Sequence, residues 1–480
     1  MTGYHRQPWL RPRGRLHTTM ALRPHRADRR HVPAVLTLAA IALGTAMNQW
    51  QRGEAAFHLA LVIGIGLPMV AALLPGSLAA LLPRRAWDRV TRSVLAVAIV
   101  AGALAIVTTP GILSVATGPM PGAHLAVGVV AALGIGSLTV DGRRGTFMLA
   151  GMTVVFFALG IWLIASTPDP RMDVYEFLRD GSRAIAQGFD PYGITFPATY
   201  PDPRWYGPGL IEDGRLLFGY PYPPVSLVAY VPSTVLTGDP RYGNLMALAL
   251  ASLLIGTAHP SRTARGAAAL LLCTPSTYFV LELAWIEPIV ALTVAACAWV
   301  ACRNARGLGV TVGVLAMAKQ YCLIAVPLAV MLLPEPITPR SVLRTMVVAC
   351  VTMALIAGPF LLWGASGFIF SVYQLQTVQP FRPDSLGLRP VIADLAGLST
   401  LYWLPFVATG MVMVLGLRLL PWTPSGYAWA LAGAFGTFFV LSKQAFPNYY
   451  IAVIACLCAS IATSGAREEE LIPTVRATRG

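Results

Sequence analysis

The stretch "FMLAGMTVVFFALGIWLIAS" (residues 147–166) contains no charged side chain, and it leads directly into "TPDPRMDVYEFLRDGSRAIAQGFDPYGITFP" (167–197), which contains several. A helix needs about 20 predominantly apolar residues to cross the hydrocarbon core of a bilayer. The first stretch has that length and composition, so it predicts a transmembrane helix. The abrupt change after residue 166 predicts that the chain leaves the membrane there and enters a polar loop.

Apolar runs of similar length recur from about residue 33 to about residue 464, separated by short polar connections. The 480 residues are 56% hydrophobic and 12% charged, and this charged fraction is about half that of a typical soluble protein. The mean hydropathy is +0.64. We therefore expect an all-α polytopic membrane protein of about 13 or 14 transmembrane helices, without a separate soluble domain.

The formal net charge of +14 comes largely from arginines in the N-terminal segment and in short connections such as "LPRRAWDRVTRS" (82–93) and "DGRRG" (141–145). An excess of arginine in short connections marks the cytoplasmic side of a membrane protein. The charge therefore indicates topology in the cell (plasma) membrane, and we expect no nucleic-acid partner. The expected regions are a cytoplasmic tail (1–31), N-terminal transmembrane helices (32–146), a main transmembrane region (147–464) and a second cytoplasmic tail (465–480).

The polar loop expected at 167–219 falls on the extracytoplasmic side by the same rule. Its stretch "DVYEFLRDGSRAIA" predicts an amphipathic helix, because at about 100° per residue the apolar side chains share one side. Three carboxylates lie within a sector of about 60° on its polar edge: Asp173, Glu176 and Asp180. This edge faces either a cavity at the membrane surface or solvent, with Arg179 and Arg183 softening its charge.

Ionisable residues inside apolar runs are functional candidates, because a charge at membrane depth is costly. Lys319 lies in the middle of a long apolar run, and Glu282 and Glu287 bracket "LAW" near the outer end of another. Further polar residues are expected near the same side of the membrane: Gln320, Arg382, Arg389, Lys443 and Gln444. We therefore expect acids and bases to converge outside.

The charge rule meets one conflict, at "HPSRTARG" (259–266). This basic stretch belongs inside, yet two full crossings after the polar loop would leave it outside. Either the Pro-rich segment near 221–237 dips into the membrane without crossing it, or the charge rule fails at this stretch; we expect the dip.

Several motifs resemble those of the integral-membrane glycosyltransferases of the GT-C superfamily, most closely the bacterial polyprenyl-phosphate-mannose-dependent mannosyltransferases. They occur in this order: Asp173 and Tyr175 followed by "AIAQGFDPY" (184–192), "YPYPPV" (220–225), "LELAWIEP" (281–288), the Lys-Gln of "GVLAMAKQYCLIAVPLAVML", and "KQAFPNYYIAV" (443–453). The resemblance covers roughly 147–464. The chain departs from the family in one respect, because the family generally places its acidic loop after the first span and here it follows the fifth.

The resemblance implies a GT-C-like fold and transfer of a sugar from a polyprenyl-phosphate donor to a glycolipid or polysaccharide acceptor, with inversion. Asp173 matches the family's catalytic base. A leaving phosphate needs fixed cations, and the candidates are Lys319, Arg382, Arg389 and Lys443. We expect sugar or acceptor contacts from Glu176, Asp180, Asp190, Tyr192, Tyr220, Tyr222, Glu282, Glu287, Gln320 and Gln444.

We expect no cofactor and no required metal, because the sequence has no Asp-x-Asp pair or His-rich cluster. The seven cysteines lie in or at the ends of apolar segments and predict neither disulfides nor a zinc site. Two other functions stay open: a multispan transporter or flippase of an envelope precursor, and a non-catalytic partner in an envelope complex. The sugar is mannose, arabinofuranose or another polyprenyl-linked residue.

Overall fold

The computed structural model of the chain describes residues 29–49, 54–74, 76–109, 121–200, 202, 204–303, 306–396 and 401–465. The two expected tails lie almost wholly outside these residues, as does the connection from 110 to 120. The described chain is mostly helical, and its strands are only two residues long each. The all-α expectation is confirmed at this level.

The first five helices occur where apolar runs predict them. Their bounds are α1 Val32–Gln49, α2 Glu54–Leu73, α3 Arg84–Thr108, α4 Pro121–Thr139 and α5 Gly142–Ser166, with a 3₁₀ turn at Gly76–Leu81. The arginine-rich stretches at 82–93 and 141–145 were expected to be connections, but most of each belongs to the beginning of α3 or α5. Arginine is a good helix former, so the helix continues from the apolar run into the basic stretch.

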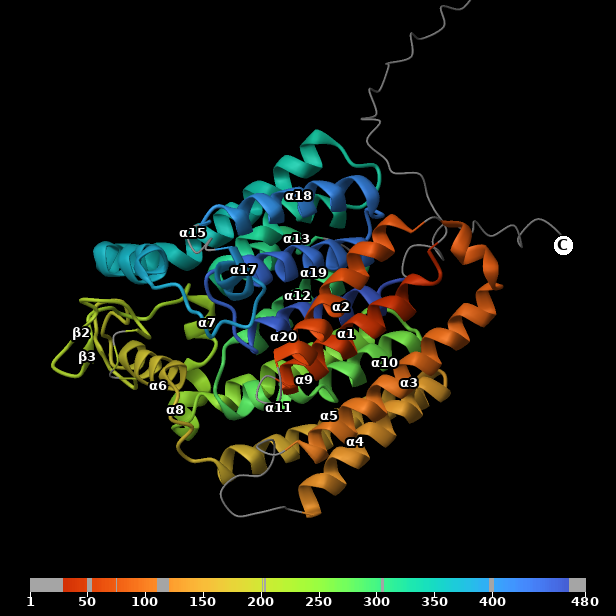
Figure 1. Cartoon of the computed structure of the whole chain (residues 1–480), viewed down its shortest axis with the longest axis horizontal. Coiled ribbons are helices and arrows are strands. Elements are labelled where there is room, and N and C mark those ends of the chain that lie inside the picture. The colour runs from red at the N-terminus through yellow and green to blue at the C-terminus, as the bar shows by residue number, and fades with distance from the viewer. Residues whose placement is uncertain are drawn as a thin grey trace, which may run out of the picture.

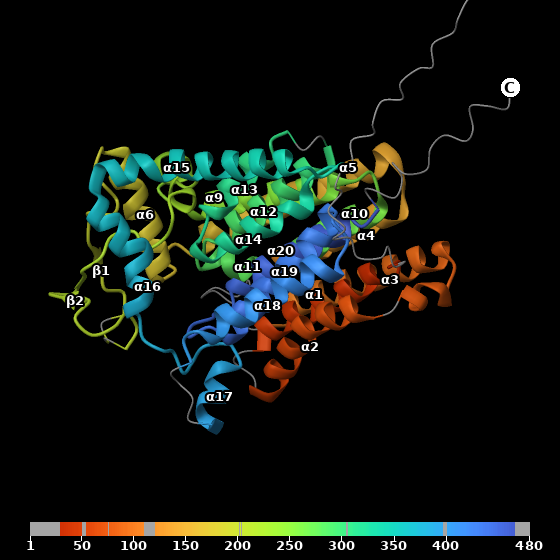
Figure 2. The same cartoon turned by 90° about the horizontal axis from the view of Figure 1, so that it is seen from above.

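The polar segment after α5 gathers at one end of the helical body (Figures 1 and 2). It contains the helices α6 (Asp173–Ala186), α7 (Val225–Val228) and α8 (Val231–Thr237). A small antiparallel sheet joins them, in the order β1 (Phe196–Pro197), β3 (Arg215–Leu216) and β2 (Ile211–Glu212). The predicted amphipathic helix is confirmed as α6, whose apolar side chains Val174, Phe177 and Leu178 are buried. Together α7 and α8 are too short to cross a bilayer, which is the geometry expected of the dip near 221–237.

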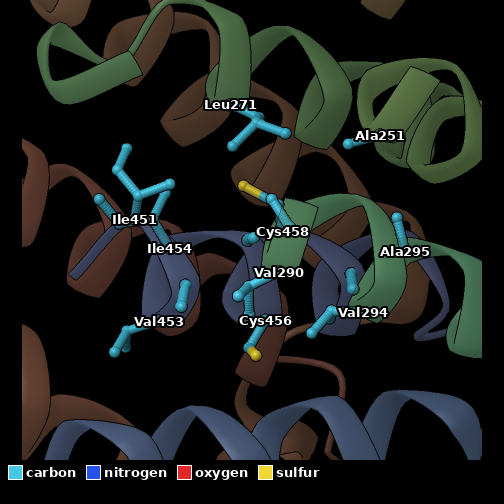
Figure 3. Close-up of a cluster of buried hydrophobic side chains, with 14 of the residues drawn as sticks. Ala251, Leu271, Val290, Val294, Ala295, Ile451, Val453, Ile454, Cys456 and Cys458 are labelled. Atoms are coloured by element: carbon cyan, nitrogen blue, oxygen red, sulfur yellow. The ribbon is translucent and has the colours of Figure 1, made fainter. Parts of the chain in front are cut away.

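The core of the molecule surrounds α20 (Tyr449–Ala462), in which every residue from Tyr450 onward is buried. Helices α1, α10 (Arg262–Leu272), α12 (Glu287–Arg303) and α19 (Pro424–Leu441) pack against it. Figure 3 shows Cys456 and Cys458 of α20 among aliphatic side chains from neighbouring helices. All seven cysteines are free, as their positions in apolar runs predict.

Four further helices complete this region. α9 (Arg241–Ala258) packs against α5, α10 and α12. The short helix α11 (Pro275–Glu282) follows α10 at a bend of 48°. The run around Lys319 was expected to be one long apolar segment, but it is broken into α13 (Leu308–Ala316), a 3₁₀ turn at Gln320–Ile324, α14 (Ala325–Leu328) and a second 3₁₀ turn at Ala329–Leu332.

The long helix α15 (Pro339–Ile369) runs along the outside of α13 (Figure 2). Thr338 and Ser341 form a capping box at its start, in which each side chain accepts a hydrogen bond from the other residue's backbone N–H. A π-helix at Phe370–Gln374 and the short α16 (Leu375–Val378) follow, and the Ser371 hydroxyl of the π-helix accepts a hydrogen bond from the Gly219 N–H of the polar loop at 2.9 Å. The remaining helices are α17 (Arg389–Ala396) and α18 (Leu404–Leu419). Both α15 and α18 expose large apolar side chains, including Leu355, Leu362 and Phe406.

Among the described residues, four helices are long and apolar enough to cross a membrane. They are Arg84–Thr108, Gly122–Thr139, Gly142–Ser166 and Pro339–Val378, the last of which is kinked at Gly364. The bent pair α10 and α11 counts as a fifth if it forms one span. Six further apolar helices are shorter than this length, because prolines and breaks divide several of the runs that the sequence presents as continuous. Within the described residues, four or five helices are thus candidates for crossing a membrane by length and composition, and the expected number of 13 or 14 spans stays a prediction.

Candidate active site

Asp173 is the first residue of α6, and its Oδ1 accepts a hydrogen bond from the Val174 N–H at 2.8 Å. Burial raises the pKa of this carboxyl from 3.8 to about 6, while the Val174 N–H, the Tyr206 hydroxyl and the Arg382 guanidinium oppose that rise. A carboxylate with this pKa is largely ionised at neutral pH yet basic enough to accept a proton, which suits a general base.

An aromatic group from the loop covers Asp173. The Tyr200 ring lies against those of Trp205 and Tyr206, at centroid distances of 5.4 and 6.2 Å. Asp173 raises the pKa of both tyrosine hydroxyls, in each case as the second cause after burial. Beside this group, a surface hollow of about 460 Å³ is lined by Asp169, Arg171, Glu176, Pro197, Thr199 and Tyr200. The hollow therefore adjoins the candidate base without including it.

Arg382 is the cation whose charge lowers the pKa of Asp173. Its guanidinium lies between two rings, with its carbon 4.1 Å from the centroid of Trp205 and 4.9 Å from that of Phe446. Nε and Nη2 donate to the two carboxylate oxygens of Asp384 at 2.7 and 2.6 Å. Stacking and bidentate pairing of this kind fix the orientation of an arginine.

The other two cations expected to bind phosphate make different contacts. The Lys443 ammonium donates to the backbone carbonyls of Gln379 at 2.6 Å and Thr377 at 3.4 Å. Arg389 begins α17, is 2% exposed, and lies over the ring of Tyr402. Burial lowers the pKa of Lys443, and the charge of Arg389 lowers it further, so these two cations are near one another.

Gln444 and Gln320 hold backbone segments together. The Gln444 Nε2 donates to the Pro380 carbonyl at 3.0 Å. The Gln320 Nε2 donates to the carbonyls of Pro221 at 2.7 Å and of Val372 in the π-helix at 3.0 Å. These amides therefore connect the segments that carry the candidate site.

Lys319 sits at the break after α13, with extended backbone, and its ammonium pairs with the carboxylate of Glu287. The two side chains are 4% and 0% exposed. The rings of Tyr449, Tyr222 and Tyr321 surround the ammonium at 4.2, 5.2 and 5.5 Å. Its charge is already balanced by Glu287, which differs from the expected role of an open phosphate-binding cation.

Glu287 has a second partner, because its Oε2 accepts a hydrogen bond from the Asn448 Nδ2 at 2.8 Å. It also begins α12, where the helix dipole favours a negative charge. Both oxygens of the buried Glu287 carboxylate therefore have a partner within the described residues, and its predicted contact with a sugar stays a prediction.

The acidic edge of α6 is partly neutralised. Arg179 pairs with both Glu176 and Asp180, and Asp180 lies 3.8 Å from Arg183. Of the three carboxylates expected on this edge, Asp173 is thus the one that lies outside the arginine network.

The "GFDPY" turn packs against the bundle. The Asp190 Oδ1 accepts the Tyr192 N–H at 3.0 Å, and the Tyr192 hydroxyl donates to the Tyr222 carbonyl at 3.0 Å. Tyr192 and Tyr220 are buried, with ring centroids 6.1 Å apart, and the Tyr220 hydroxyl hydrogen-bonds with that of Ser226 at 3.0 Å. The contacts of Asp190, Tyr192 and Tyr220 hold this turn against the bundle, and their predicted contacts with a sugar stay predictions.

Arg241 is a buried cation that sequence reasoning missed. Its side chain is 0% exposed, pairs with Asp239 at 2.6 Å, and donates to the hydroxyl of Thr167 at 2.9 Å and the carbonyl of Glu282 at 3.3 Å. It joins the end of α5 to α9 and α11 beneath α6. The sequence signal is Asp239 two residues before Arg241 at the start of an apolar run.

Glu282 is the last residue of α11. Its Oε2 is buried and has no hydrogen-bond partner within the described part of the chain. Ala284 follows with a φ of 60°, a region that L-residues adopt at a cost of about 1–3 kcal/mol. The "LELAW" connection between α11 and α12 is therefore strained and carries an isolated carboxylate oxygen.

No group of three or more His, Cys, Asp or Glu side chains able to hold a metal ion occurs in the described ranges. Comparison of the chain with protein-family models finds no match, and comparisons with curated proteins and with solved structures find none either.

Proposed function

We propose that the chain is a multi-pass enzyme of the cell membrane that transfers a sugar, mannose in the first instance, from a polyprenyl-phosphate donor to a glycolipid or polysaccharide acceptor. In this proposal the chain crosses the bilayer 13 or 14 times, the shorter apolar helices included, and residues 167–219 lie on the extracytoplasmic face. The family resemblance of the motifs and the grouping of their residues at one end of the bundle support it.

The observation that carries the proposal is that Asp173, whose pKa burial raises to about 6, lies within the electrostatic reach of the Arg382 guanidinium, which Trp205 and Asp384 hold in place. Asp173 takes the proton from an acceptor hydroxyl as that oxygen attacks the anomeric carbon. The bond from this carbon to the phosphate oxygen breaks on the opposite face, so the configuration inverts. Arg382 stabilises the negative charge that develops on the departing lipid phosphate.

The contacts of Arg382 leave it able to bind an anion. Asp384 occupies its Nε and Nη2 edge, and no hydrogen bond joins Nη1 to another side chain within the described ranges. Lys443 and Arg389 lie beyond it as additional positive charge. Lys319 takes a different role, because it and its partner Glu287 are both buried, whereas Asp384, the partner of Arg382, is half exposed.

The test is Asp173→Asn in the full-length chain, assayed with a synthetic polyprenyl-phosphate mannose donor in detergent or proteoliposomes. We expect turnover to fall by about 10²–10⁴-fold, the usual contribution of a general base. The matched control is Asp213→Asn, the same change on an exposed residue of the same loop. Wild-type turnover in Asp173→Asn would remove Asp173 from the mechanism.

A transporter or flippase is the second candidate, because two apolar runs are broken: between α10 and α11, and at Lys319. Broken helices with polar residues at the break are typical of transporter binding sites. Movement of a lipid-linked sugar across proteoliposomes that survives Asp173→Asn, with no sugar transfer in wild type, would favour this function.

A further inference from the structure

One short turn, Phe446–Tyr449, lies between the two cations of the candidate site. The Arg382 guanidinium carbon is 4.9 Å from the Phe446 ring centroid, and the Lys319 ammonium is 4.2 Å from that of Tyr449. The two rings are neighbours, with centroids 6.4 Å apart, and the Tyr449 N–H donates to the Phe446 carbonyl at 3.1 Å. The largely buried Arg382 and the fully buried Lys319 therefore contact the same turn.

On its buried side, the turn is held by a hydrogen bond to an ion pair. Asn448 is 5% exposed and donates to Glu287 at 2.8 Å, while Glu287 pairs with Lys319. A buried ion pair of this kind is stable only when its remaining hydrogen-bonding positions are satisfied, and the Asn448 amide satisfies one of them. Any movement of the turn would break this bond, so the network fixes where residues 446–449 lie.

On the outer side of the turn, the Phe446 ring contacts the Arg382 guanidinium. The Trp205 ring also contacts the guanidinium, with its centroid 4.1 Å from the guanidinium carbon. The backbone also links the two segments, because the Arg382 N–H donates to the Lys443 carbonyl at 3.1 Å, three residues before Phe446. Asp173 and Arg382 both act electrostatically on Tyr449, so the candidate base lies near the same turn.

We propose that Glu287, Lys319 and Asn448 are positioning residues that hold Arg382 in its anion-binding orientation through the Phe446–Tyr449 turn. The anion is the phosphate group of a single-chain lipid phosphate. The inference rests on the proposed function in one point, the assignment of Arg382 to the donor phosphate. It adds that the buried ion pair acts on the site without touching the substrate.

The experiment measures binding of n-dodecyl phosphate to the purified full-length chain by titration calorimetry, in a double-mutant cycle of Asn448→Ala and Arg382→Lys. Asn448→Ala leaves the Glu287–Lys319 pair intact but releases the turn, and Arg382→Lys keeps a positive charge that cannot stack or pair as a planar fork. We expect Asn448→Ala to weaken binding roughly tenfold in wild type and to have no further effect in Arg382→Lys.

Thermal unfolding separates positioning from general damage. Asn448→Ala should lower the Tm by a similar amount in both backgrounds, because its buried hydrogen bond is lost in each. The control is Ser460→Ala, which removes another buried hydrogen-bonding group from the far end of α20; it should lower the Tm without changing the affinity.

Three results would overturn the inference: no binding of n-dodecyl phosphate by wild type, unchanged affinity in Asn448→Ala, or an equal loss of affinity in both backgrounds. The binding assay does not require sugar transfer. A non-additive cycle without any transferase activity would therefore sustain the inference and reject the proposed function. Asp173-dependent transfer with an additive cycle would do the reverse.

Discussion

The pKa of Asp173, raised by burial to about 6, makes a pH dependence of activity the first expectation at the scale of single residues. A general base works only when ionised, so kcat/KM should fall tenfold for each pH unit below about 6 and level off above it. The measurement is kcat/KM between pH 5 and 8.5. A profile that is flat from pH 5 to 8.5 would contradict the assignment of this carboxylate as the base.

The same pKa predicts an effect on stability. The folded state holds the Asp173 proton more tightly than the unfolded state does, so this residue's favourable contribution is lost as the pH rises from 3.8 through about 6. At 1.36 kcal/mol per pKa unit, the loss is at most about 3 kcal/mol. Asp173→Asn should therefore raise the Tm above that of wild type at pH 8 and leave it unchanged near pH 3.5. An equal shift at both pH values would point to packing instead of charge.

Single residues were predictable from the sequence where their chemistry was unusual for their surroundings. Lys319 and Glu287 are charged residues in apolar runs, and they do come together. Their pairing could not be predicted, because it depends on a backbone break at Lys319 that apolar composition does not reveal. Asn448 and Asp384 were missed because an amide or a carboxylate near a helix end is common, and only its three-dimensional partner gives it a role.

At the scale of elements, the "GFDPY" turn depends on close approach by two glycines. A Cβ on Gly219 or on Gly367 of α15 would overlap the backbone carbonyl of Tyr192. Gly367→Ala should therefore displace the turn and destabilise the protein by about 1–3 kcal/mol, as overpacking does. Gly358→Ala on the same helix is the control, because a Cβ there meets nothing within 4 Å. Equal Tm values for the two variants would show that α15 does not hold the turn.

Elements were predicted well where one period dominated the sequence. The carboxylates and apolar residues of α6 alternate with a helical period, and the helix has the predicted bounds, Asp173–Ala186. Boundaries failed where arginine continued a helix beyond its apolar part, as at the start of α3. The break at Lys319 was not predicted either. The run is apolar on both sides of Lys319 and Gln320, and the polar groups packed beside it set the path of the chain.

At the scale of the whole molecule, the proposed topology predicts opposite labelling of two sites. Asp213→Cys, in the loop with α6, should react with a membrane-impermeant maleimide in intact cells. Arg143→Cys, at the start of α5, should react only after permeabilisation. Both changes belong in a Cys350→Ser background, because Cys350 is the one exposed cysteine of the seven. Labelling of both sites in intact cells would reject the assignment of sides.

The length of α15 has a consequence for how the protein senses its surroundings. The helical stretch before its kink at Gly364, Pro339–Trp363, amounts to about 37 Å at about 1.5 Å per residue, while the hydrocarbon core of a bilayer is about 30 Å thick. A helix longer than the hydrocarbon core is in hydrophobic mismatch with the bilayer, and it responds by tilting or bending. At its C-terminal end, α15 continues through the π-helix and α16 toward Arg382. In the proposed topology, the length of the lipid acyl chains would therefore change the tilt of α15, and α16 would pass that change on to the Arg382 guanidinium.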